Sequence, residues 1–228
     1  MNYWLKHFDS NVSENPTNLL KQVGKTVNGV EVEQLQIDLI IDAICDGLLL
    51  DENSKVIDLC CGNGLLTIKI AEKCNTVLGV DYSSQLIKTA NDFNKNNKVS
   101  YIESDITALD PSVFEECNSV YMYEGLQHIT RDNFLRILEL ISVNLNITKI
   151  FLGGIPDKAL INQYYDTDEK WDYYLKCESN GTPHLGKWWE QSEIEEICKL
   201  FGFKLKIKPQ KKNLYSSYYR FDCLLERA

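Results

Sequence analysis

The chain has 228 residues, 44% of them hydrophobic, and carries a formal net charge of −9. This length and composition are sufficient for one substantial core, so we expect residues 1–228 to form a single domain. The acidic balance argues against nucleic acid as a partner, because phosphate binding draws on clustered lysine and arginine, and the lack of a long apolar run argues against a membrane partner.

Strands and helices alternate along most of the chain. Apolar residues recur at helical spacing, and we expect helices over residues 30–50, 64–73, 83–94, 131–143 and 191–201. Short apolar and β-branched runs between them predict strands over residues 55–60, 76–80, 99–103, 119–123 and 149–153. Such alternation predicts an α/β fold with a doubly wound, mostly parallel sheet.

The last third of the chain departs from this alternation. Residues 203–208 and 215–226 both have the composition of strands, and only the turn 209–213 separates them. Two strands joined by so short a link pair antiparallel, because a parallel crossover needs a dozen or more residues. We therefore expect a seven-stranded sheet that ends in a C-terminal antiparallel hairpin.

The segment VIDLCCGNGLLT at residues 56–67 reads as a strand, a glycine turn and the start of a helix, and Asp81 ends the next strand. Glycine lets a ligand approach the backbone, and a helix start presents unsatisfied N–H groups. A carboxylate at the end of the second strand suits the two hydroxyls of a ribose. The pattern indicates an adenosine-containing cofactor; the alternative is an ordinary strand-turn-helix unit.

These features resemble class I S-adenosylmethionine-dependent methyltransferases over roughly residues 34–226. The family's glycine motif, Asp-x-Gly-x-Gly-x-Gly, is similar to residues 58–64, where Cys60 stands in place of the first glycine. The turn must therefore tolerate a side chain at that position. The resemblance implies S-adenosyl-L-methionine as the cofactor and methyl transfer as the reaction.

The resemblance also implies roles for individual residues. Gly62 and Gly64 would line the methionine part of the cofactor, Asp58 would organise its amino group, and Asp81 would hold the ribose. The sequence SDI at residues 104–106 is similar to the family's adenine-binding motif. The full set of expected cofactor-binding residues is Asp58, Cys60, Gly62, Gly64, Asp81, Tyr82, Asp105, Ile106 and Tyr123.

His128 is the candidate catalytic residue. The sequence YEGLQHI at residues 123–129 is similar to the Glu-x-Leu-x-His sequence that follows the fourth strand in many small-molecule methyltransferases. An imidazole beside the acceptor can remove a hydroxyl proton while the methyl group arrives, because its pKa lies near working pH. The alternative is a histidine that caps a helix or packs around the cofactor.

Residues 158–190 form an aromatic insertion after the fifth strand, and residues 1–30 precede the first predicted helix. We expect residues 1–30 to form an N-terminal cap segment and the insertion to cover the acceptor pocket, as insertions at this place do in similar methyltransferases; the alternative for the insertion is a small satellite core. Candidate substrate-binding residues are Tyr165, His184, Lys187, Trp188, Tyr218 and Arg220. On the final predicted strand, alternation places Tyr218, Arg220 and Asp222 on one face.

A finer resemblance connects the chain to methyltransferases of bacterial surface-polysaccharide biosynthesis. It rests on FLGGIPD at residues 151–157, GKWW at 186–189, YRFD at 219–222 and VGKTVNG at 23–29. It implies a small-molecule acceptor, either a sugar hydroxyl or a phosphate-like oxygen such as that of a phosphoramidate. A phosphoryl oxygen is already anionic, so it needs positive groups and alignment but little base catalysis.

Two other classes of function stay open. An NAD-dependent oxidoreductase would use the glycine turn for a pyrophosphate, although Thr67 replaces the last small residue of that fingerprint. A non-catalytic cofactor-binding partner would keep the turn and lose the acceptor pocket. The eight cysteines include no CxxC pair and residues 2–18 do not resemble a signal peptide, so we expect a cytoplasmic protein with reduced thiols and no metal site.

Overall fold

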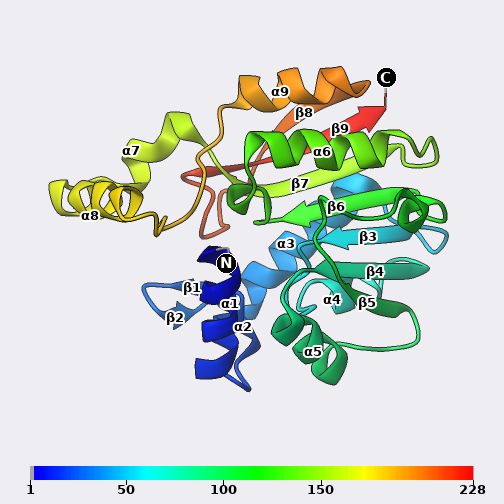
Figure 1. Ribbon diagram of the computed structural model, residues 1–228, viewed down its shortest axis with the longest axis horizontal. Coiled ribbons are helices and arrows are strands. Elements are labelled where there is room, and N and C mark those ends of the chain that lie inside the picture. The colour runs from blue at the N-terminus through cyan, green and yellow to red at the C-terminus, as the bar shows by residue number, and fades with distance from the viewer. Residues whose placement is uncertain (1–2, 228) are drawn as a thin grey trace.

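The computed structural model describes residues 3–227 and contains a seven-stranded sheet with the strand order β5-β4-β3-β6-β7-β9-β8 (Figure 1). The strands are β3 (Lys55–Leu59), β4 (Thr76–Asp81), β5 (Val99–Glu103), β6 (Ser119–Tyr123), β7 (Lys149–Pro156), β8 (Phe203–Pro209) and β9 (Arg220–Arg227). The strands from β3 to β7 pair in parallel, whereas β9 pairs antiparallel with both β7 and β8. The predicted α/β fold with a C-terminal hairpin is confirmed.

Helices cover both faces of this sheet. The helices that follow or precede its strands are α3 (Gln34–Leu48), α4 (Thr67–Ile70), α5 (Ser84–Phe93), α6 (Arg131–Ser142) and α9 (Gln191–Leu200). Alternate residues of a strand point to opposite faces. Thus Ile57 packs in the same core cluster as α6 and α9, while its neighbour Val56 packs in the cluster of α3 and α4. Burial on both faces explains why the central strands β6 and β7 are nearly continuous apolar runs.

Three elements begin three or more residues later than predicted, and each difference has a local cause. The first predicted helix, α3, begins at Gln34 rather than at residue 30, because β1 (Thr26–Val27) and β2 (Val30–Glu31) form a hairpin there. The helix after the glycine turn begins at Thr67, because Gly64 has a φ of +76°, which a right-handed helix excludes. The last strand begins at Arg220 because residues 214–219 form turns, so strand alternation does not place Tyr218.

Two segments lie beyond the carboxyl ends of the parallel strands (Figure 1). The N-terminal segment contains α1 (Tyr3–Glu14), α2 (Leu19–Gln22), β1 and β2. The insertion contains a 3-10 turn (Lys158–Leu160), α7 (Ile161–Tyr164) and α8 (Asp168–Ser179). Outside these two segments, 3-10 turns also span Pro111–Phe114 and Leu126–His128. Doubly wound folds bind their ligands at this end of the sheet, so both segments lie where they can enclose a site.

The insertion builds a small core of its own. Tyr165, Trp188 and Tyr219 are buried together, and further aromatic and aliphatic residues of α7, α8 and the following loop pack around them. Its two ends are joined at the sheet, where Asp157 bridges to Trp189. The satellite core considered as an alternative is therefore present. The insertion also lines the cavity described below.

The remaining sequence expectations concern cysteines, metals and membranes. The eight cysteines all lie within residues 3–227 and are free thiols, and Cys45 and Cys60 are the two that are only partly buried. In the described part of the chain, no group of three or more His, Cys, Asp or Glu side chains is placed to hold a metal ion. No helix within residues 3–227 is long and apolar enough to cross a membrane.

Candidate active site

A cavity of about 800 Å³ opens at the carboxyl ends of the central strands. The N-terminal segment, the glycine turn, the ends of β4 and β6, the insertion and residues 215–220 all contribute to its walls. Ligand sites of small molecules generally have volumes of roughly 300 to 1,000 Å³. The cavity is therefore large enough for a cofactor together with a small acceptor.

The glycine turn forms one wall. Cys60, which replaces the motif's first glycine, has a φ of +61°, and Gly62 has a φ of +56°. A non-glycine residue in the left-handed region is strained, so the surrounding contacts must hold Cys60 there. Val23 Cγ1 lies 2.9 Å from where a Cβ of Gly62 would stand, so Gly62 has no room for a side chain.

Asp81 extends from the end of β4 to the same wall. Its Oδ2 accepts a hydrogen bond from the Gly62 N–H and its Oδ1 one from the Ser83 N–H, both at 2.9 Å. Burial raises the pKa of the Asp81 carboxyl, although these two donors oppose the shift. Ser83 Oγ in turn donates to Asp9 Oδ1 at 2.7 Å, which ties α1 to this side of the cavity.

Asp58 lies behind the wall rather than in it. The Asp58 side chain is 3% exposed, and its Oδ2 accepts hydrogen bonds from Thr67 Oγ1 and Tyr121 OH, each at 2.6 Å. Burial raises the pKa of Asp58 to about 7 despite these donors. Asp58 does not line the cavity, so it joins β3, β6 and α4 beneath the turn instead of facing a ligand directly.

The other expected cofactor residues divide in the same way. Cys60, Gly62, Asp81, Tyr82 and Tyr123 line the cavity. Gly64, Asp105 and Ile106 do not: Gly64 packs against Tyr101, and Ile106 is buried in the core. Asp105 is exposed beyond β5, and its Oδ1 accepts from the Thr107 N–H at 2.8 Å.

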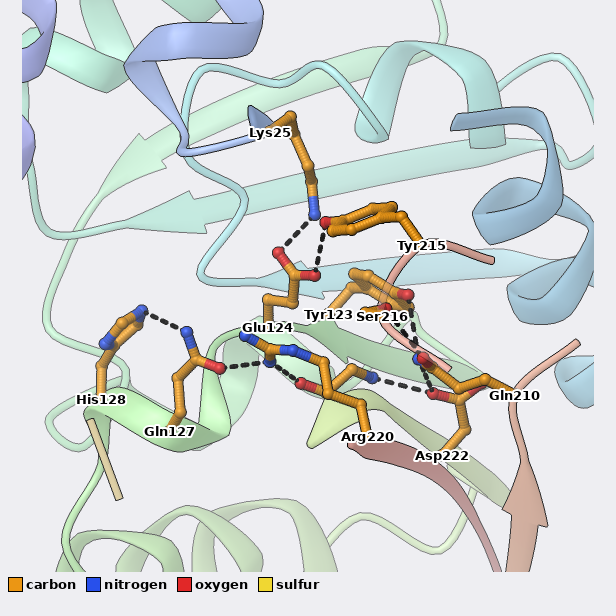
Figure 2. A network of polar contacts seen from close by, with 11 residues as sticks. Lys25, Tyr123, Glu124, Gln127, His128, Gln210, Tyr215, Ser216, Arg220 and Asp222 are labelled. Carbon is orange, nitrogen blue, oxygen red and sulfur yellow. Dashed lines mark hydrogen bonds and ion pairs between the residues drawn. The ribbon is translucent and has the colours of Figure 1, made fainter. Parts of the chain in front are cut away.

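An ion pair lies at the end of β6 (Figure 2). Lys25 Nζ is 2.5 Å from Glu124 Oε2, and Tyr215 OH donates to Glu124 Oε1 at 3.1 Å. Burial alone would raise the pKa of Glu124, but the charges of Lys25 and Arg220 outweigh it and hold the pKa below its usual value. Glu124 is therefore a carboxylate at neutral pH, in a strained conformation with a φ of +54°.

Arg220, the first residue of β9, is 5% exposed and lines the cavity. Its Nη1 donates to Gln127 Oε1 and to the carbonyl oxygen of Gly154, which the bulge in the pairing of β7 with β9 brings within reach (Figure 2). Burial would lower the pKa of Arg220, but Tyr219 and Glu124 raise it, so the guanidinium stays charged. Both hydrogen-bond acceptors are neutral; within residues 3–227 Arg220 forms no ion pair, and its Nε is buried without a hydrogen-bond partner.

His128 lies beside this network. Gln127 accepts from Arg220 through Oε1, so its Nε2 is the donor toward His128 Nε2 at 3.3 Å, and the imidazole proton is on Nδ1. The ring of His128 contacts the rings of Trp4 and Phe8, with centroid distances of 4.0 and 5.5 Å. Burial and the charge of Arg220 lower the pKa of His128 to about 3, so the imidazole is neutral.

The substrate residues predicted in the aromatic segments occupy two places. Tyr165, His184, Tyr218 and Arg220 line the main cavity, and Tyr165 OH lies 3.2 Å from His184 Nδ1. Lys187 and Trp188 line a second cavity of about 550 Å³, which shares Trp4, Gln127 and His128 with the first. Lys187 Nζ is engaged by Glu193 Oε1 at 2.6 Å and lies over the Trp189 ring.

Several residues at this site were not among the predicted ones. They are Trp4, Phe8, Lys25, Glu124, Gln127 and Tyr215. Glu124 and Gln127 belong to the YEGLQHI motif that contains His128, so the sequence could have predicted them as site residues. Lys25 lies in the VGKTVNG run that the finer resemblance quoted, although nothing there marked it as a site residue; Trp4, Phe8 and Tyr215 come from segments with no recognisable chemical pattern.

The glycine turn and the ends of β4 and β6 lie in a segment that matches a known family. A family model described as a methyltransferase domain matches residues 56–146, which is less than half of the chain. The fold is the Rossmann-like fold of class I methyltransferases. Residues 56–146 are thus similar to a methyltransferase domain, and structures with this fold have been solved with bound SAM or SAH.

Solved structures resemble the chain over nearly its whole length. An S-adenosylmethionine-dependent methyltransferase from Anabaena variabilis has a TM-score of 0.69 at 16% identity, covering 99% of this chain and 94% of that chain. Magnesium protoporphyrin IX methyltransferase from Synechocystis with bound SAH has a TM-score of 0.63 at 18% identity, covering 98% and 94%. The DhpI–SAH complex has a TM-score of 0.65 at 13% identity, covering 99% and 96%. No curated protein sequence matches significantly.

Proposed function

We propose that the protein transfers the methyl group of S-adenosyl-L-methionine to an anionic oxygen of a small molecule, a phosphate-like group on a surface-glycan precursor. The observation that carries this proposal is Arg220, a buried guanidinium on the cavity wall that bonds only to neutral acceptors. Glu124 acts on Arg220 from nearby but is ion-paired with Lys25, and a buried charge without an ion-pair partner of its own is costly unless a ligand supplies one. An acceptor bearing a phosphate-like oxygen would supply it.

The residues on the cofactor side fit S-adenosyl-L-methionine. When bound, this cofactor would supply a sulfonium methyl group that an acceptor oxygen attacks in line, so that the O–C bond forms as the C–S bond breaks and S-adenosylhomocysteine leaves. Asp81 presents a carboxylate at the end of β4 for the ribose hydroxyls, and Gly62 lies beside it on the cavity wall. Tyr82, Cys60 and Tyr123 complete the wall.

The state of His128 supports an anionic acceptor. A general base works best when its pKa lies near the operating pH, and the pKa of His128 is about 3. Its Nε2 accepts from Gln127, and its Nδ1 carries the proton and is buried without a partner among the described residues. An acceptor that is already anionic needs no base, so His128 would serve as a neutral wall between Trp4 and the Arg220 network.

A neutral sugar hydroxyl is the second candidate acceptor. Its support is the position of His128 on the cavity wall, together with the tyrosine rings of Tyr164, Tyr218 and Tyr219, which suit a sugar face. In this case His128 would exchange its contact with Gln127 for the acceptor hydroxyl and act as the base. The two candidates assign opposite importance to His128 and Arg220.

Variants of these two residues test the proposal. Methyl transfer is measured with sugars and their phosphorylated counterparts, and S-adenosylhomocysteine (SAH) affinity is measured in each variant by calorimetry. For an anionic acceptor we expect Arg220→Gln to raise the acceptor KM about 10- to 100-fold, with Arg220→Lys intermediate. His128→Ala should change kcat by less than about tenfold.

The opposite result would favour the second candidate. Transfer to a neutral hydroxyl, with His128→Ala lowering kcat about 10²- to 10⁴-fold, would make His128 the base and contradict the anionic acceptor. Arg131→Gln, at an exposed arginine outside the main cavity, is the matched control. Binding of NAD in place of SAH by the unmodified protein would contradict methyl transfer altogether.

A further inference from the structure

The ion pair between Lys25 and Glu124 places two opposite charges inside the cavity. Lys25 is 4% exposed, the Glu124 side chain is 14% exposed, and both residues line the cavity. Tyr215 holds the second oxygen of Glu124, and Lys25 Nζ lies 4.8 Å from the centre of the Tyr123 ring (Figure 2). The proposed acceptor chemistry uses Arg220 and leaves this pair without a role.

The pair lies against the glycine turn. Val23, two residues before Lys25, occupies the space where a Cβ of Gly62 would stand. Gly125, next to Glu124, packs so closely on Cys60 that a Cβ there would lie 2.9 Å from the Cβ of Cys60. The glycine turn is thus packed between a neighbour of Lys25 and a neighbour of Glu124 in the sequence.

Asp58, the carboxylate expected to bind the cofactor's amino group at the glycine turn, is engaged elsewhere. Asp58 is bonded to Thr67 and Tyr121 and does not line the cavity, and both oxygens of Asp81 accept backbone N–H groups beside β4. Of the cavity-lining carboxylates within residues 3–227, Glu124 is the one that extends from the end of β6 beside the turn, while Glu169 is on α8. An ammonium bound at the turn would find its counter-charge in Glu124.

We propose that Lys25 and Glu124 bind the α-amino-acid end of S-adenosyl-L-methionine by exchanging partners, so that Lys25 pairs with its carboxylate and Glu124 with its ammonium. The inference rests on the proposed function for the identity of the cofactor. A buried charge that loses its partner is strongly destabilising. A zwitterion avoids this cost. When it separates Lys25 from Glu124, its carboxylate becomes the new partner of Lys25 and its ammonium becomes the new partner of Glu124.

The exchange makes recognition depend on both ligand charges together. A ligand with an ammonium and no carboxylate brings a second cation to Glu124 and leaves Lys25 without a counter-charge. A ligand with neither group leaves the ion pair intact. The site therefore discriminates between a zwitterion and a singly charged analogue more strongly than between a zwitterion and a neutral one.

The test compares three ligands by calorimetry: SAH, its decarboxylated analogue, and 5′-methylthioadenosine, which lacks the amino-acid end. In the unmodified protein we expect SAH to bind most tightly and the decarboxylated analogue to bind no better than 5′-methylthioadenosine. Lys25→Met and Glu124→Gln should each weaken SAH binding about 10- to 100-fold. The affinity for 5′-methylthioadenosine should change less than about threefold, and Lys25→Arg should restore most of the SAH affinity.

Matched controls come from the same cavity. Lys170→Met and Glu169→Gln alter a cation and a carboxylate of α8 that line the cavity away from the turn, and should leave all three affinities unchanged. Equal losses for SAH and 5′-methylthioadenosine in Lys25→Met would show a merely structural ion pair and overturn the inference. Unchanged SAH affinity in Lys25→Met and Glu124→Gln would also overturn it. Failure of SAH to bind the unmodified protein would instead refute the proposed function.

Discussion

Individual residues at the glycine turn are held in conformations that their types do not favour. Cys60 and Glu124 both have positive φ values, of 61° and 54°, at the carboxyl ends of the adjacent strands β3 and β6. Each such residue costs on the order of 1 to 3 kcal/mol, which the surrounding structure must offset. The strain directs the backbone of both residues around the cavity, and Glu124 thereby reaches Lys25.

Asp81 is the residue whose removal should most reduce cofactor affinity. Its carboxylate already aligns the Gly62 and Ser83 N–H groups, and charge-assisted bonds to two ribose hydroxyls would add to these. We expect Asp81→Ala to weaken SAH binding by roughly 2 to 4 kcal/mol, measured by calorimetry. Asp81→Asn, which keeps an acceptor oxygen, should lose less. An Asp81→Ala variant with unchanged SAH affinity would remove Asp81 from the cofactor site.

At the scale of elements, the two segments beyond the sheet are attached differently. The N-terminal segment is tied to the cavity floor by polar contacts, among them Asp9 with Ser83 and Lys25 with Glu124. The insertion is anchored at its ends, since Trp189 N–H donates to the Pro156 carbonyl, and the aromatic core of α7 and α8 lies between those anchors. This difference makes the insertion the more independent of the two.

We therefore predict that residues 158–190 act as a lid. Hydrogen exchange in α7 and α8 should be faster than in β3 without ligand, and should slow when SAH is added, because these helices close one side of the cavity. Gly181 has a φ of +65°, and no atom outside residues 180–182 lies within 4 Å of where its Cβ would stand, so it suits a pivot. If exchange in α7 and α8 is already as slow as in β3 before ligand is added, the insertion is fixed core and the lid prediction is wrong.

At the scale of the whole molecule, the Asp58 carboxyl couples the stability of the fold to pH. Its pKa of about 7 in the folded state lies above the ordinary value of 3.8 because burial disfavours the carboxylate. Between about pH 4 and pH 7 the folded protein holds a proton that the unfolded chain has released. The free energy of unfolding therefore falls as pH rises through this window, by up to about 4 kcal/mol for this group.

Asp58→Asn should remove that dependence, since an amide oxygen can still accept from Thr67 and Tyr121. We expect the variant to gain stability relative to the unmodified protein between pH 5 and pH 8, measured by urea unfolding at both values. Asp92→Asn, on the exposed side of α5, is the control and should leave the pH profile unchanged. Parallel pH profiles for Asp58→Asn and the unmodified protein would show that Asp58 does not titrate in this range.

The sequence by itself determined the features that depend on neighbouring residues. Apolar runs and their spacing predicted the strands of the sheet and the hairpin at its end, and the turn at residues 58–64 together with Asp81 predicted one wall of the cavity. These elements form from local periodicity, from the conformational freedom of glycine, and from the rule that parallel strands end at one edge. The replacement of the motif's first glycine by Cys60 was likewise visible in the sequence, because the motif is a run of neighbouring residues.

Only the tertiary structure decided which charges meet in the cavity. Lys25 pairs with a residue 99 positions away, and Arg220 bonds to residues 93 and 66 positions away. No local pattern records such contacts, because they depend on how the N-terminal segment folds back and on the bulge that brings Gly154 toward β9. The burial of Asp58 and His128 was likewise decided by packing, and the low dielectric around a buried group, rather than its residue type, sets its pKa and its chemistry.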